Sequence, residues 1–131
     1  MTVVVGYVPN PFGEAALDAG IEEARRRNAR LVVVNTSKGD ALVDQKFASD
    51  DQLAAVRTRL DGIDVETEVQ QSSASVDVAE GVLAVVAAES AEVLVIGIRR
   101  RTPVGKMLMG SVTQRLLLDA PCAILAVKTP A

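Results

Sequence analysis

A basic stretch that begins at Gly97 and ends at Thr113 carries the residue types that bind phosphate groups. Gly97 follows an apolar run, where a glycine lets the backbone turn sharply and lets a ligand approach closely. Gly110 precedes Ser111 and Thr113 at the start of a helical pattern, and a helix start offers free N–H groups to an anion. Between the two glycines lie four cations, Arg99, Arg100, Arg101 and Lys106. The stretch therefore predicts a phosphate-binding loop that joins a strand to a helix.

A P-loop and a purely structural turn are two other interpretations of this stretch, and the sequence excludes only the first. Gly105 and Lys106 resemble the end of a P-loop, but the pattern fails at two positions. Arg100 stands where the first glycine is required, and Met107 follows the lysine where a serine or threonine should hold magnesium. A purely structural role, a tight turn followed by a capped helix, stays open as the alternative to phosphate binding.

Composition argues against several functional classes. The chain has no histidine, which removes Ser-His-Asp catalysis, histidine-ligated metals and the commonest general base, so neither a catalytic centre nor a metal site is expected. A net charge of −3 and only 2% aromatic residues argue against binding to nucleic acid. The single cysteine, Cys122, lies in an apolar run, which predicts a buried, unreactive side chain in a reducing compartment. No signal peptide or membrane-spanning run is recognisable, so the expected location is the cytoplasm.

Five apolar strands are predicted to alternate with four helices along the chain. Most of the strand runs lack an alternation of apolar and polar residues, which is typical of strands covered on both faces. One run, residues 63–69, does alternate, so it is expected at an edge of the sheet. The order βαβαβαβαβ predicts one α/β domain, residues 1–131, with a doubly wound, mostly parallel sheet and helices on both faces. The expected strands are residues 2–7, 31–34, 63–69, 93–96 and 122–127.

Short-range signals predict where the helices begin. Asn10 before Pro11 is typical of an N-cap followed by proline in the first turn. Ser49 with Gln52 matches a capping box. Ser75 or Asp77 is the expected cap of the third helix, and the fourth helix is predicted over residues 111–118. The inward side chains expected of that fourth helix are Val112, Leu116 and Leu117.

At this point the chain resembles the universal stress protein family along essentially its whole length. The resemblance rests on the strand ending VLVIG, on Gly97 followed at the family's spacing by Gly110-Ser111-Val112-Thr113, and on the closing PCAILAVK. The ATP-binding branch of that family has a further glycine where this chain has Arg100. The resemblance implies a sheet of order 3-2-1-4-5, with the winding reversed between strands one and four. It also implies a homodimer paired through the last strand, Cys122 to Val127.

The resemblance further implies where a nucleotide would bind. In ATP-binding members an aspartate just after the first strand contacts the adenosine, and the matching residue here is Val8. A residue at the end of the second strand lines the adenine pocket, and the loop after Gly97 holds the phosphates. The nucleotide-binding residues implied for this chain are Tyr7, Val8, Thr36, Gly97, Arg99, Arg100, Gly110, Ser111, Val112 and Thr113.

Two functions from different classes follow. The first is a cytoplasmic stress-response protein that binds ATP or a related adenine nucleotide as a switch with little or no catalysis. The second is a homodimer that binds no nucleotide and works through protein partners, which the replacements at Val8 and Arg100 would favour. A slow ATPase is a weaker third possibility. Magnesium could accompany a triphosphate, but no carboxylate in the sequence is an evident ligand for it.

Overall fold

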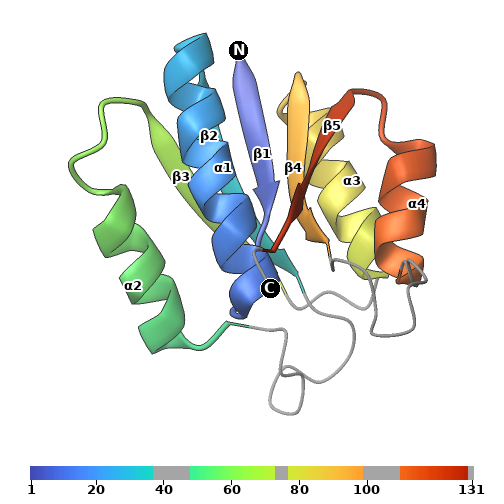
Figure 1. The fold of residues 1–131 in the computed structure, drawn as a ribbon, viewed down its shortest axis with the longest axis horizontal. Coiled ribbons are helices and arrows are strands. Elements are labelled where there is room, and N and C mark those ends of the chain that lie inside the picture. Colours follow the sequence, from blue (N-terminus) through green and yellow to red (C-terminus); the bar gives the residue numbers. More distant parts are fainter. Residues whose placement is uncertain (37–47, 73–76, 99–109, 130–131) are drawn as a thin grey trace.

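A single sheet of five parallel strands forms the centre of the molecule, as a computed structural model of the chain shows (Figure 1). The structure describes residues 1–36, 48–72, 77–98 and 110–129. The strand order is β3-β2-β1-β4-β5, which confirms both the predicted fold class and the order that the family resemblance implied. The strands are β1 (Thr2–Gly6), β2 (Arg30–Thr36), β3 (Thr67–Ser72), β4 (Val93–Ile98) and β5 (Ala123–Lys128).

Helices cover both faces of this sheet, as predicted. Helices α1 and α2 pack on one face, and α3 and α4 pack on the other (Figure 1). The helices are α1 (Pro11–Arg27), α2 (Asp50–Leu60), α3 (Val78–Ala88) and α4 (Ser111–Asp119). None of the helices in the described ranges is long and apolar enough to cross a membrane.

The unbroken valine runs of the central strands follow from this double cover. In β1, Val3 and Val5 join the apolar cluster under α1 and α2, whereas Val4 joins the cluster under α3 and α4. All three side chains are fully buried. A strand covered on both faces exposes neither set of alternating side chains to water, which is why these runs do not alternate.

Side-chain caps begin three of the four described helices. The side chain of Asn10 accepts hydrogen bonds from two N–H groups of the first turn of α1, as predicted. Ser49 and Gln52 form the predicted capping box of α2, and Asp77 caps α3. Helix α4 differs, because its N-cap residue is Gly110, which has no side chain to accept a hydrogen bond.

Several predicted boundaries were wrong. Strand β3 begins at Thr67 rather than at residue 63, although it does lie at an edge of the sheet. Ile63 and Val65 instead pack from the preceding connection against the core, which produces an alternating pattern without strand pairing. Strand β4 continues through Gly97 to Ile98, so the glycine lies inside the strand and not after it.

The inward face of α4 was also partly mispredicted. Leu116 is buried, as expected, and Val112 packs against the same apolar cluster. Leu117 is 40% exposed and therefore does not face the core. Helix α4 lies beside α3 at the end of the sheet (Figure 1), so it buries a narrower stripe than a helix with neighbours on both sides.

Candidate functional site

A pocket of about 500 Å³ opens where the winding of the sheet reverses. The strand order places this reversal between β1 and β4, which lie side by side in the middle of the sheet (Figure 1). In open α/β sheets, ligands bind outside the carboxyl ends of the strands at such a point. The described lining residues are Gly6, Tyr7, Val8, Asn10, Phe12, Gly13, Val34, Thr36, Val78, Val82, Ile96, Gly97, Ile98, Gly110, Val112, Thr113 and Leu116.

The pocket brings together most of the residues implied by the family resemblance. The predicted residues that line it are Tyr7, Val8, Thr36, Gly97, Gly110, Val112 and Thr113. Ser111 lies between two of them in the chain, but it is exposed and does not line the pocket. Arg99 and Arg100 lie outside the described residues.

The described wall of the pocket is mainly apolar. Valine, isoleucine and leucine side chains reach it from β2, β4, α3 and α4, and no described lining residue carries a charge. A wall of this kind suits a flat, uncharged group such as a heterocyclic base. It contains no pair of carboxylates and no acid–base couple, so the described lining shows no machinery for catalysis.

Most polar side chains of this wall already have partners. The hydroxyl of Tyr7 donates to Glu14 Oε1 at 2.6 Å, and Thr36 Oγ1 donates to the carbonyl of Val78 at 3.4 Å. Burial, and then the hydrogen bond to Glu14, raise the pKa of Tyr7 above its usual value, so this phenol stays protonated. Thr113 is different: within the described part of the chain, nothing forms a hydrogen bond with its hydroxyl.

The N-termini of α1, α3 and α4 lie at the pocket, and only that of α4 has no side-chain cap. At the start of α1, Asn10 Oδ1 accepts from the N–H groups of Phe12 at 3.0 Å and Gly13 at 3.1 Å. At the start of α4, Gly110 has no side chain to play this part. The positive end of the α4 dipole and the N–H groups of its first turn are therefore the main electrostatic feature that the described lining offers an anion.

The basic segment between these elements starts and finishes at the pocket. Ile98 is the last described residue before it, Gly110 is the first after it, and both line the pocket. The intervening residues 99–109 contain four cations and no acid. Chain connectivity alone therefore attaches a strongly basic segment to both sides of this opening.

The structure shows why position 97 is occupied by glycine, which the sequence did not reveal. A Cβ atom at Gly97 would lie 2.0 Å from the carbonyl oxygen of Phe12, so β4 and the first turn of α1 pack backbone against backbone. A Cβ at Gly13 would lie 1.6 Å from the carbonyl oxygen of Val8 in the same region. The close approach at Gly97 is thus made by the protein's own chain. By contrast, a Cβ at Gly110 would meet no heavy atom within 4 Å.

Sequence reasoning missed a buried amide that supports the edge of the pocket. Asn35 is fully buried; its Nδ2 donates to the carbonyl of Tyr7 at 2.8 Å, and its Oδ1 accepts from the N–H of Ala48 at 2.8 Å. Gln71, its neighbour in β3, donates from Nε2 to the same Oδ1 at 2.9 Å and to the carbonyl of Ala48 at 2.7 Å. The predicted strand ended at residue 34, but β2 continues to Thr36 and so includes Asn35. An asparagine directly after an apolar run was the available signal, since a buried amide needs partners.

Comparison with known proteins agrees with this fold. A profile described as "Universal stress protein family" matches residues 1–128. This chain belongs to the universal stress protein family. A universal stress protein from Mycolicibacterium smegmatis is 49% identical over 126 residues, which cover 96% of each chain.

Solved universal stress proteins share the fold at lower identity. One, solved in complex with cAMP, has a TM-score of 0.74 and 20% identity, and the match covers 98% of this chain and 97% of that one. Another, from Archaeoglobus fulgidus in complex with dAMP, has a TM-score of 0.65 and 20% identity over 97% of this chain and 96% of that one. At these identities the likeness establishes the common architecture.

The backbone contact at Gly97 leads to a test of stability. Replacing Gly97 with alanine should lower the free energy of unfolding by at least about 2 kcal/mol, because a methyl group cannot fit against the Phe12 carbonyl without a backbone shift. Gly110→Ala is the matched control and should cost less than about 1 kcal/mol. Urea unfolding followed by circular dichroism measures both, and equal costs for the two variants would contradict the packing argument.

Proposed function

We propose that this universal stress protein binds ATP or a related adenine nucleotide in the pocket between β1 and β4. The observation that carries the proposal is the juxtaposition, at the switch point of the sheet, of an apolar recess with the uncapped N-terminus of α4. A nucleotide has the matching two-part chemistry, because its base is flat and largely apolar on its faces and its phosphates are anionic. A volume of about 500 Å³ is also of the size that holds such a ligand.

In this proposal each part of the pocket has a separate task. The base and ribose lie against the apolar wall, near Val8 and Thr36. The phosphates accept hydrogen bonds from the first turn of α4 and from the hydroxyl of Thr113. Arg99 and Arg100, in the segment attached at both sides of the opening, neutralise the phosphate charge, for which guanidinium groups are well suited.

The relatives support an adenine nucleotide in particular. The two solved proteins described above are in complex with cAMP and with dAMP, and both share this architecture. The absence of an acid–base pair from the described lining favours binding over turnover. A bound nucleotide would then act by stabilising the conformation to which it binds, as a cytoplasmic stress-response switch.

A homodimer with protein partners is the second candidate function, and the outer edge of the sheet favours it. Strand β5 pairs only with β4 among the described strands, and the side chains of Ile124 to Val127 are half-buried rather than buried. An edge with unpaired backbone groups and apolar side chains is a template for a second strand. We propose pairing of two copies through residues 122–127.

Nucleotide affinity tests the first proposal. Isothermal titration should show that ATP binds and that adenosine binds at least about tenfold more weakly, since charge-assisted hydrogen bonds contribute about 1.5–3 kcal/mol each. Gly110→Asn should weaken ATP binding by a similar factor. The new side chain would accept hydrogen bonds from the same N–H groups of α4 that the phosphates use. The free energy of unfolding of Gly110→Asn should differ from that of the wild type by only a few tenths of a kcal/mol.

Gly110→Ala is the matched control, because it adds the same Cβ without adding a cap. It should weaken ATP binding much less than Gly110→Asn does. Equal affinity for adenosine and ATP would exclude the phosphate site at α4. No binding of either ligand at millimolar concentration would refute the nucleotide proposal and leave the dimeric interaction protein as the better account.

The dimer proposal predicts the molecular mass in solution and slow hydrogen exchange in β5. Light scattering should give twice the 13.8 kDa of one chain, and Leu118→Lys, a change outside β5, should leave that mass unchanged. Hydrogen exchange of residues 123–128 should quicken when the protein is diluted into its monomeric range. A mass of 13.8 kDa at every concentration tested would show that the edge of β5 stays unpaired.

A further inference from the structure

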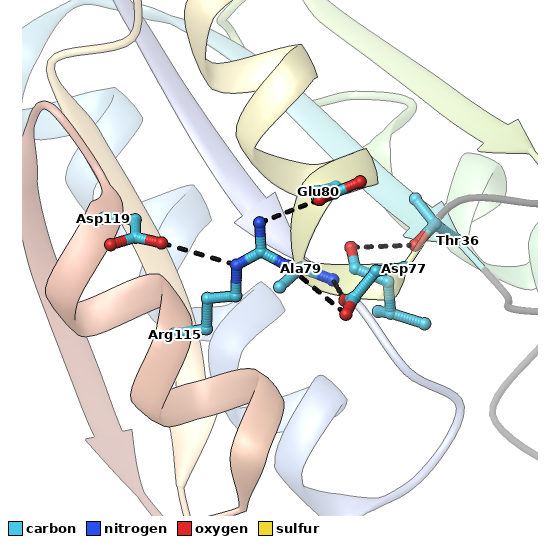
Figure 2. Close-up of polar contacts among 7 residues, drawn as sticks. Thr36, Asp77, Ala79, Glu80, Arg115 and Asp119 are labelled. Carbon is cyan, nitrogen blue, oxygen red and sulfur yellow. Dashed lines mark hydrogen bonds and ion pairs between the residues drawn. The ribbon is translucent and has the colours of Figure 1, made fainter.

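One arginine on α4, Arg115, contacts three carboxylates (Figure 2). Arg115 Nη2 lies 2.9 Å from Glu80 Oε1, Nη1 lies 3.3 Å from Asp77 Oδ2, and Nε lies 3.4 Å from Asp119 Oδ2. Asp119 belongs to α4 itself, whereas Glu80 and the cap residue Asp77 belong to α3 and its first turn. Two of the three contacts therefore join one helix to the other.

Both of the joined helices form walls of the pocket. Val78 and Val82 of α3 line it, and Val112, Thr113 and Leu116 of α4 line it opposite. These α4 residues lie within three positions of Arg115 in the chain, on the same turns of the helix. A shift of α4 relative to α3 would thus change the width of the pocket and the direction of the α4 N–H groups.

Helix α3 is in turn fixed to the sheet. The hydroxyl of Thr36, at the end of β2, donates to the carbonyl of Val78 beside Asp77 (Figure 2). The approach is close, because a Cβ at Gly81 would lie 3.2 Å from Thr36 Cγ2. Polar contacts therefore run from the end of β2 to the start of α3 and on to α4.

Apart from these polar contacts, helix α4 is attached through a narrow apolar stripe, in which Val112 and Leu116 join the cluster on this face of the sheet. Leu116 is the only buried residue among its nine, and Leu117 and Leu118 are exposed. In addition, its N-cap residue has no side chain to hold the first turn. The contacts from Arg115 to α3 are accordingly a large part of what sets the position of the α4 N-terminus.

We propose that Arg115 is a positioning residue, which holds the α4 N-terminus against α3 so that its N–H groups face the pocket. The proposal rests on the nucleotide site proposed above and adds a determinant of its affinity. Arg115 does not bind phosphate itself, because all three nitrogen atoms of its guanidinium already contact carboxylates. Since the group is 38% exposed, its main effect is on geometry rather than on global stability.

Affinity for ATP across four variants tests this role. Arg115→Gln should weaken binding at least about fivefold relative to the wild type, a typical size for coupling between neighbouring elements. Glu80→Gln breaks a contact between helices and should also weaken binding. Asp119→Asn removes the same charge at nearly the same exposure, 53% against 51%, but breaks only a contact within α4, so it should have no effect. Arg57→Gln on α2 controls for loss of an exposed arginine.

Hydrogen exchange without ligand gives a second, independent readout. In Arg115→Gln, the hydrogen-bonded amides of residues 114–119 should exchange at least about fivefold faster than in Arg57→Gln, with α1 and α2 unchanged. If the wild type binds ATP but Arg115→Gln binds equally well, or if Glu80→Gln and Asp119→Asn behave alike, the positioning role is wrong and the nucleotide site stands. If the wild type binds no nucleotide, the proposed function fails, and unchanged exchange at residues 114–119 would overturn the positioning role as well.

Discussion

The contact between the backbone of β4 and the first turn of α1 determines the shape of the site. Because Gly97 and Gly13 lack side chains, the start of α1 can lie directly against the ends of β1 and β4. This close approach closes one side of the opening between the two central strands. The pocket therefore extends away from α1, toward α3 and α4, where the walls are apolar and one helix N-terminus has no side-chain cap.

The result is a pocket whose two halves offer different chemistry. Side chains of β2, β4 and α3 form an apolar recess, and the polar groups within it, such as the Thr36 hydroxyl, mostly have partners inside the protein. The start of α4 supplies N–H groups and the Thr113 hydroxyl. Positive charge can come only from outside the described lining, and the basic residues 99–109 are joined to it at both ends. Base and phosphate recognition would thus depend on separate parts of the chain.

The sequence predicted the features that depend on neighbouring residues. The caps at Asn10 and Ser49 were predictable because a cap and its helix lie within four residues of each other. The sheet order came from the family resemblance, since periodicity does not say which strands pair. The reason for Gly97 and the partners of Asn35 could not be predicted, because they involve atoms from segments distant in the chain. Leu117 was misplaced because helical periodicity does not reveal how many neighbours a helix has.

The most direct test of this account is to locate the ligand on the protein by nuclear magnetic resonance. Amide spectra of the labelled protein would be recorded during titration with ATP. The account predicts that the largest shifts fall on residues 6–13, on Thr36 and Gly97, and on residues 110–113. Shifts confined to the cleft between α1 and α2, near Gln52 and Arg59, or no shifts at millimolar ATP, would contradict it.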